Sequence, residues 1–160
     1  MSSTEAQFRG LIAPIAASVG GRSLDAELQR ELNQRYPAHG EAYRQIMQSC
    51  RDGIAAGWMC PHEHGGIRYG RVLEAAPELG GCSVDVVQMQ DVAGPHHRHP
   101  KGEIDLIMPL DEQAEFDGHP AGWLVYGPDT AHRPTVSGGS ALVLYLLPEG
   151  AIEFTRRAQQ

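Results

Sequence analysis

The first 57 residues show the hydrophobic periodicity of amphipathic helices. Apolar residues recur at intervals of three and four positions in three successive stretches, as on one face of a helix. Thr4 begins a possible capping box for the first stretch, and Ser23 is a possible cap for the second. Pro14 should kink or split the first helix, and the third should end near Gly57. We therefore expect residues 1–57 to be helical, with apolar faces that cover a β-barrel or contact another subunit.

From Gly66 onward the pattern changes to short, β-like runs that are separated by Gly and Pro. Seven short strands at this spacing favour a barrel or sandwich over alternating β-α-β units. The predicted fold class is mainly β, with an antiparallel β-barrel over residues 58–160 and an α-helical N-terminal extension, forming one structural unit. The predicted strands are Ile67–Ala75, Ser83–Asp91, Glu103–Pro109, Gln113–Phe116, Gly122–Tyr126, Ala141–Leu147 and Ile152–Thr155.

Composition and charge narrow the class of partner. The formal net charge is −7 and Lys101 is the only lysine, which disfavours nucleic acid and favours a small molecule. No apolar run approaches the roughly 20 residues needed to span a bilayer, and no basic segment leads into an apolar one, so we expect a cytoplasmic protein. The cysteines are odd in number and have no paired spacing, which argues against a disulfide framework: Cys50, Cys60 and Cys82.

Candidate chemistry is concentrated between residues 94 and 103. If this segment is extended, His97 and His99 point to the same side. The proline and glycine that follow allow a short turn to bring Glu103 back as an oxygen ligand. His132, which follows a Gly-Pro turn, is the expected fourth ligand. Three imidazoles and a carboxylate suit a divalent first-row metal ion, with Fe, Mn, Ni, Co and Zn all compatible. The alternative is that these histidines stabilise turns or line a barrel mouth without a metal.

A second group of reactive side chains lies at Cys60, His62 and His64. These residues could form a zinc clip, but no second pair at finger-like spacing completes a set of four ligands. A loop near the barrel mouth that contacts substrate and an ordinary polar loop both remain open as alternatives.

The order His97-x-His99-x-x-x-Glu103, followed by His132, resembles the paired metal-binding motifs of the cupin superfamily. That resemblance implies a cupin-like antiparallel β-barrel with the ligands pointing into it. The chain departs from those motifs at three flanking positions, where glycine or asparagine is usual: Asp91, Leu110 and Val136.

A longer set of phrases, spread over residues 58–154, is similar to the bacterial 4-hydroxylaminobenzoate lyase family of 4-nitrobenzoate catabolism. The resemblance implies conversion of 4-hydroxylaminobenzoate to 3,4-dihydroxybenzoate (protocatechuate) with release of ammonia. Among the phrases are Val84-Asp85-Val86-Val87, Gly94-Pro95-His96-His97-Arg98-His99-Pro100, Gly102-Glu103-Ile104-Asp105 and His132-Arg133-Pro134-Thr135-Val136.

The implied reaction adds water and loses ammonia, so it needs no external electron carrier. The absence of a Gly-rich dinucleotide motif is consistent with this. A Lewis acid or proton donor at the hydroxylamine oxygen would assist the reaction. A metal ion held by the four predicted ligands could serve; without one, Glu103 and an imidazole such as His97 would handle the protons. We therefore expect Glu103 and His97 to be the catalytic residues.

The carboxylate of such a substrate should meet a guanidinium, whose planar fork matches it. The candidates for this contact are Arg68, Arg71 and Arg133, each of which could equally be a solvated surface arginine. Aromatic side chains could line a slot for the substrate ring, although such residues on barrel strands are more often core; they are Trp123, Tyr126 and Tyr145.

Two other functions remain open from the residues alone. One is another metal-dependent cupin enzyme, such as a dioxygenase acting on a small aromatic or carboxylic acid. The other is a sensor or storage module that binds a small acid without turnover. In each case the apolar stripes on the helices suggest a homodimer, because a closed dimer is the commonest way to bury such a surface.

Overall fold

The N-terminal part of the protein is helical, as predicted. A computed structural model describes residues 3–155 and contains three α-helices in this range: α1 (Glu5–Val19), α2 (Ala26–Arg35) and α3 (Glu41–Ala56). The capping box at Thr4 is confirmed, and α3 ends where Gly57 adopts a left-handed conformation. Of the two predicted effects of Pro14, a kink or a split, the split is wrong, because α1 continues past this residue.

The predicted cap of the second helix is also wrong. Asp25, not Ser23, is the N-cap of α2, and its side chain accepts a hydrogen bond of 2.9 Å from the backbone N–H of Leu28. Both residue types are good caps, so their local preference could not separate two candidates that lie two positions apart.

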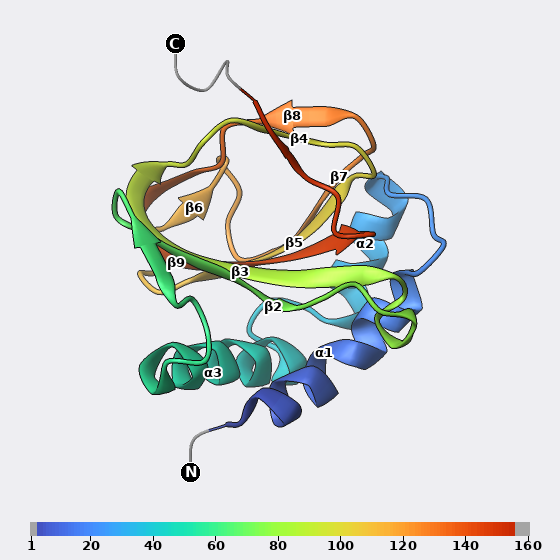
Figure 1. Ribbon diagram of the computed structural model, residues 1–160, viewed down its shortest axis with the longest axis horizontal. Coiled ribbons are helices and arrows are strands. Elements are labelled where there is room, and N and C mark those ends of the chain that lie inside the picture. Colours follow the sequence, from blue (N-terminus) through green and yellow to red (C-terminus); the bar gives the residue numbers. More distant parts are fainter. Residues whose placement is uncertain (1–2, 156–160) are drawn as a thin grey trace.

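The rest of the described chain forms two antiparallel sheets, which confirms a mainly β fold with a helical N-terminal extension (Figure 1). The larger sheet has the order β1-β2-β3-β9-β5-β7, with β6 paired to β9, and the smaller has the order β10-β4-β8. A short 3-10 helix precedes β3. The bounds are β1 (His62–His64), β2 (Ile67–Leu73), η1 (Pro77–Leu79), β3 (Cys82–Ala93), β4 (His97–His99), β5 (Glu103–Pro109), β6 (Glu115–Phe116), β7 (Gly122–Tyr126), β8 (Thr130–His132), β9 (Thr135–Pro148) and β10 (Glu153–Phe154).

All seven predicted strands are present within residues 3–155, and the bounds of β5 and β7 match the prediction. Three further strands, β1, β4 and β8, are only three residues long. Strands this short carry too few apolar residues to produce an alternating pattern. The hydrophobic pattern therefore did not predict that a second, smaller sheet forms.

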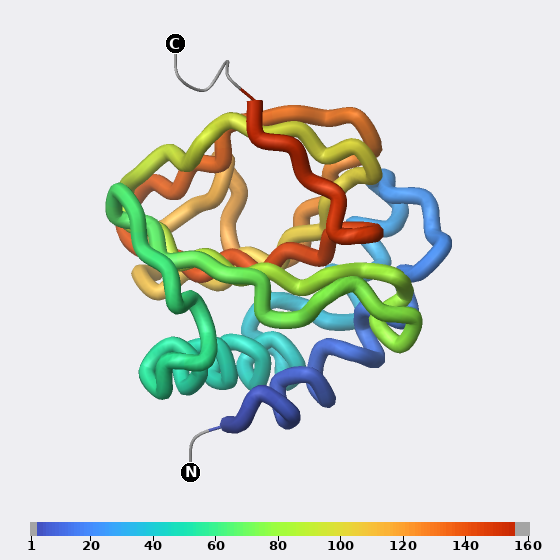
Figure 2. The backbone as a smooth tube through the Cα atoms, in the orientation of Figure 1, coloured from blue at the N-terminus to red at the C-terminus, as the bar shows by residue number. Residues whose placement is uncertain are grey.

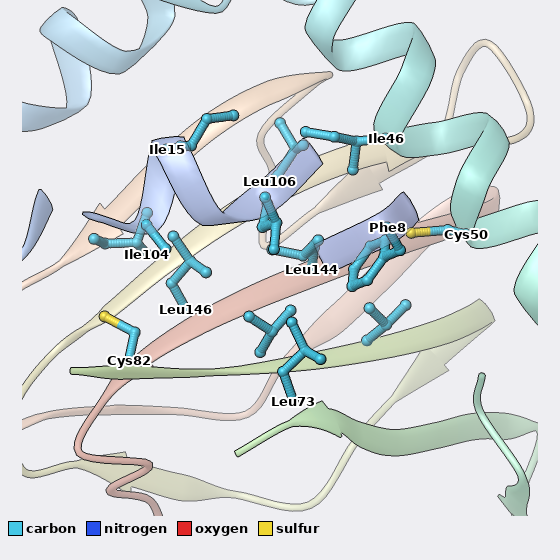
Figure 3. Packing of buried hydrophobic residues seen from close by; sticks show 14 of the residues in the cluster. Phe8, Ile15, Ile46, Cys50, Leu73, Cys82, Ile104, Leu106, Leu144 and Leu146 are labelled. Atoms are coloured by element: carbon cyan, nitrogen blue, oxygen red, sulfur yellow. The ribbon is translucent and has the colours of Figure 1, made fainter. Parts of the chain in front are cut away.

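The apolar faces of the helices pack against the outer face of the large sheet (Figure 3). Phe8 and Ile15 from α1 and Ile46 from α3 lie in one cluster with Leu106 of β5 and Leu144 of β9, and all five are at most 2% exposed. The helices thus cover the barrel face, as one of the two expectations stated. Within residues 3–155 no helix combines the length and apolar character needed to cross a membrane.

Helix α2 protects the free edge of the large sheet at β7. Asn33 accepts a hydrogen bond of 2.8 Å from the backbone N–H of Trp123 and donates one of 3.0 Å to its carbonyl oxygen. Gln29 accepts a further bond of 2.9 Å from the N–H of Val125. These side chains replace the missing neighbouring strand, so the edge does not present unpaired backbone groups to other chains.

The small sheet and the segment that carries β10 lie on the opposite side of the large sheet from α1 and α3 (Figure 2). The inner face of the large sheet packs a second apolar cluster, which includes Met89, Phe116, Val143 and Leu147. This cluster fills only part of the space between the sheets, and the remainder holds the polar residues described next.

Candidate metal centre

The predicted ligands come together between the two sheets. His97 and His99 lie on β4, Glu103 begins β5, and His132 ends β8. Because β4 is extended, its two histidines point to the same side, as alternation requires. Antiparallel pairing of β4 with β8 places His132 directly opposite His97.

A tight turn brings Glu103 back to the histidines. The N–H of Gly102 donates a hydrogen bond of 3.2 Å to the carbonyl oxygen of His99, and Gly102 has φ +90°. A Cβ atom at this position would lie 2.6 Å from a side-chain carbon of Leu24 and 2.8 Å from the carbonyl oxygen of Tyr126. Glycine is therefore required for both backbone conformation and space.

The ligand atoms of the four residues lie within 4.8 Å of one another. Nε2 of His99 is 3.1 Å and Nε2 of His97 is 3.6 Å from Oε1 of Glu103, while Nε2 of His132 is 3.7 Å from Oε2. The two Nε2 atoms of His97 and His132 are 3.1 Å apart. The predicted set of three imidazoles and one carboxylate is thus a real cluster.

Each histidine is held from behind by a hydrogen bond to its Nδ1 atom. For His97 the partner is the carbonyl oxygen of Pro95 at 3.3 Å, and for His132 it is Oδ2 of Asp117 at 2.5 Å. For His99 it is the hydroxyl of Thr130 at 3.1 Å, whose own proton goes to the carbonyl of Gly127. These three groups accept, so each Nδ1 carries the proton and each Nε2 directs a lone pair into the cluster.

Converging lone pairs require positive charge at the centre. Two buried atoms there, Nε2 of His99 and Oε2 of Glu103, have no hydrogen-bond partner within residues 3–155. Burial raises the pKa of Glu103, and hydrogen bonds from His97 and His99, which require protons on their Nε2 atoms, outweigh burial and lower it. Protons on the imidazoles or a cation must balance this arrangement, and the donor set fits a divalent first-row metal ion. The cluster is therefore able to hold a metal.

Two further carboxyl groups lie beside the cluster. Burial and the hydrogen bonds from His132 and Tyr126 act in opposite directions on Asp117, and the net effect lowers its pKa, so it is ionised. Burial and the neighbouring Glu103 raise the pKa of Asp105 well above its ordinary value. Asp117 was missed in the sequence, because an Asp-Gly pair between strands is also typical of an ordinary turn.

A cavity of about 380 Å³ borders the cluster at His97 and Glu103. Its volume lies in the range of about 300–1,000 Å³ that is typical of small-molecule sites. Arg71 and Asp85 supply charged groups to its wall. The apolar part of the wall, which dominates, includes Ile67, Val87, Met89, Pro134, Tyr145, Leu147, Ile152 and Phe154.

The three predicted arginines have different surroundings. Arg71 lines the cavity and forms two hydrogen bonds with Asp85, of 2.7 and 3.2 Å, and its side chain is 30% exposed. Arg68 has a side chain that is 51% exposed and lies 3.7 Å from Glu63, and it is not among the residues that line the cavity. Arg133 is exposed and approaches the carbonyl oxygen of Gly94 at 3.5 Å.

Of the predicted aromatic slot, only Tyr145 borders the cavity within the described chain. The hydroxyl of Tyr126 donates a hydrogen bond of 2.6 Å to Asp117, and its ring centroid is 4.7 Å from that of His132. Trp123 belongs to the helix-covered cluster, where its indole N–H donates to the carbonyl of Tyr36.

The second group of reactive side chains does not form a metal cluster within residues 3–155. The Cys60 thiol is buried and donates to the carbonyl oxygen of Val86, while His62 and His64 are exposed on β1. His64 does border the cavity, but the expected loop is wrong for this segment, because His62–His64 form strand β1.

Comparison with known sequences gives a family. Residues 10–154 match the family described as "PnbB: 4-hydroxylaminobenzoate lyase". A 4-hydroxylaminobenzoate lyase of Nocardioides sp. (strain LMS-CY) is 35% identical over 151 residues, which cover 88% of this chain and 89% of that protein. A 4-hydroxylaminobenzoate lyase of Pseudomonas putida is 31% identical over 167 residues, covering 94% and 95% of the two chains.

Solved cupin structures are more distant. An RmlC-like cupin protein from Ralstonia eutropha JMP134 has a TM-score of 0.44 and 12% identity, over 59% of this chain and 63% of that one. A putative acetylacetone dioxygenase from Methylibium petroleiphilum PM1 has a TM-score of 0.44 and 16% identity, over 58% and 68% of the two chains. The family assignment therefore rests on the sequence relatives.

Proposed function

Because the chain belongs to the 4-hydroxylaminobenzoate lyase family, we propose that its cavity converts 4-hydroxylaminobenzoate and water into 3,4-dihydroxybenzoate and ammonia. The observation that carries the proposal is the position of the cavity. One continuous space borders the metal cluster at His97 and Glu103, has a guanidinium in its wall at Arg71, and is otherwise mainly apolar. A flat ring that carries a carboxylate and a hydroxylamino group would find a partner for each among these groups.

Four side chains would hold the metal: His97, His99, Glu103 and His132. A bound divalent ion supplies Lewis acidity at the hydroxylamine oxygen, which weakens the N–O bond. Its identity among Fe, Mn, Ni, Co and Zn is a question for elemental analysis of protein purified without chelator.

The chain's own residues bind, orient and exchange protons. Arg71 pairs with the substrate carboxylate, since a guanidinium carries five N–H donors and two of its hydrogen bonds go to Asp85. Arg68, Arg133 and Tyr126 were also predicted to contact the substrate, but they are not among the described residues that line the cavity, so we assign them no contact. If no metal is bound, His97 and Glu103, which border the cavity, are the proton-handling groups at the reacting end. The apolar wall excludes bulk water from the ring and packs against its faces.

The direct test is incubation of purified protein with 4-hydroxylaminobenzoate, with ammonia and the catechol product measured together. We expect equal amounts of both products, loss of turnover after chelator treatment, and recovery when a divalent metal is returned. Consumption of O2 in step with product would instead indicate a dioxygenase. Tight binding of the acid without product would indicate a sensor or storage module.

A homodimer and a cytoplasmic location stay predictions. The apolar stripes that suggested a dimer are buried within the chain against the large sheet, so burying them does not require a second subunit. Light scattering over a range of protein concentrations measures the oligomeric state directly.

A further inference from the structure

Asp117 has an unusually complete set of hydrogen bonds for a residue in a turn. It follows β6, has φ +50°, and its side chain is 13% exposed. Oδ2 accepts bonds of 2.5 Å from Nδ1–H of His132 and 2.6 Å from the hydroxyl of Tyr126. Oδ1 accepts a bond of 2.9 Å from the backbone N–H of Thr135. A carboxylate with three donors fixed in three segments cannot rotate without losing at least one of them.

The backbone of Asp117 is held as well. Its N–H donates a bond of 2.8 Å to the carbonyl oxygen of Thr135, so the two residues are joined in both directions. Contacts from β7, β8 and the start of β9 thus position the carboxylate, and none of them requires a bound ligand.

The effect on His132 differs from that on the other two histidines of the cluster. His97 and His99 donate to uncharged oxygens, a carbonyl and a hydroxyl, whereas His132 donates to an ionised carboxylate. A charged acceptor binds the Nδ1 proton more strongly and increases electron density at Nε2. Of the three imidazoles, His132 therefore has the most firmly assigned tautomer and the strongest donor atom.

Tyr126 acts on the same carboxylate. Its hydroxyl is a donor to Asp117, and its ring lies against the ring of His132. The hydroxyl contact restrains Oδ2 of Asp117, the same atom that His132 contacts, and the ring restricts rotation of the imidazole.

We propose that Asp117 is a positioning residue, supported by Tyr126, that sets the tautomer and orientation of His132 so that Nε2 faces the metal cluster. This inference rests on the proposed function for its purpose, since a histidine tautomer matters most when Nε2 binds a metal. The tautomer of His132 is a property of the metal-free protein and can be measured without any metal or substrate.

The test variant is Asp117→Asn. Asn tolerates the left-handed backbone conformation, so the turn is retained. Asn has one acceptor oxygen and one NH2 group, however, for three donors. Either the NH2 group faces the N–H of Thr135, or it faces Nδ1 of His132 and favours the tautomer with the proton on Nε2.

Two measurements follow. Nitrogen NMR of histidine-labelled, metal-free protein should show the His132 proton on Nδ1 in the unsubstituted protein and a shift toward Nε2 in Asp117→Asn. Competition with a chromogenic chelator, with Zn2+ as the probe, should show affinity weakened by about 10–100-fold in this variant. Tyr126→Phe, which keeps the ring and removes one donor, should weaken affinity by a smaller factor.

A matched control is Asp91→Asn. Asp91 also has a positive φ and accepts a backbone bond, of 3.1 Å from Gly139, and it has no hydrogen bond or ion pair with the cluster within residues 3–155. Its substitution should leave both readouts unchanged. An unsubstituted protein whose His132 carries its proton on Nε2 would overturn the proposal, as would Asp117→Asn with unaltered tautomer and Zn2+ affinity. Failure of the unsubstituted protein to turn over substrate would contradict the proposed function but leave the NMR result decisive for Asp117.

Discussion

The two faces of the large sheet are made from the same strands but have different chemistry. On β5, Ile104 and Leu106 point to the helices, while Glu103 and Asp105 point to the inner face. All four residues are at most 1% exposed, so burial does not distinguish the faces. The difference is that the outer face packs apolar side chains against the helices, whereas the inner face combines an apolar cluster with buried acids. Stability and chemistry are thus assigned to alternate residues of one strand.

The largest effect is expected from the inner face. His99→Ala removes a ligand that is fully buried, and we expect bound metal to be lost and kcat/KM to fall by about a thousandfold, or about 4 kcal/mol of transition-state stabilisation. Elemental analysis and steady-state kinetics measure the two effects. His62→Ala removes an exposed histidine from β1 and should change neither. Full metal content in His99→Ala would contradict the ligand assignment.

On the outer face the expected effect is on stability alone. Phe8 is fully buried between α1 and the sheet, and Phe8→Ala should lower the free energy of unfolding by about 3–5 kcal/mol. Urea denaturation measures the loss, and the folded fraction should keep its metal. Phe154→Ala is the comparison on the cavity side, where the ring is 66% exposed, and it should change stability by no more than about 0.5 kcal/mol. Equal losses in both variants would remove the distinction between the faces.

A smaller effect is expected from the arginine in the cavity wall. Arg71→Ala removes a charged hydrogen-bond donor and should raise KM by about 10–100-fold with little change in kcat. The double variant Arg71→Ala, Asp85→Asn controls for the unpaired acid, since burial already raises the pKa of Asp85. Arg68→Ala, on the same strand but outside the cavity wall, should leave KM within about twofold. A larger effect at Arg68 than at Arg71 would reverse the assignment.

The thiols all belong to the helix-covered cluster, and the effect expected there is one of chemical reactivity. Burial raises the pKa of Cys60 to about 12 and that of Cys82 to about 11, and it raises the pKa of Cys50 as well. Because the thiolate is the reactive form, a thiol reagent at pH 8 should react at least about a hundredfold more slowly with folded than with denatured protein. Labelling should rise only as the pH approaches these values. Rapid labelling of Cys60 at pH 8 would show that this thiol is open to the cavity side.

Features of the fold and of the candidate site that depend on local sequence patterns could be predicted. Residues 103–109 and 122–126 were placed correctly because their apolar runs are bounded by turn residues. The ligand set was predictable because two histidines in alternation point to one side of a strand wherever that strand lies.

Other features depend on tertiary contacts that have no local signal. Whether Arg68 or Arg71 faces the cavity depends on the pairing of β2 with β3, including a register irregularity between Arg71 and Leu73. The role of Asp117 depends on Tyr126 and His132 arriving from later strands. The short strands β4 and β8 exist because they pair with each other, not because their sequences favour extended structure.

The distribution of ligands between the sheets has a consequence for stability. His97, His99 and His132 belong to the small sheet and Glu103 to the large one, so a divalent ion bound by all four would cross-link the two layers. An ion that binds only the folded chain raises the free energy of unfolding by about 2.7 kcal/mol when its free concentration is a hundred times Kd. The melting temperature would then rise with metal concentration, and thermal shift would report the loading of the site without any substrate present.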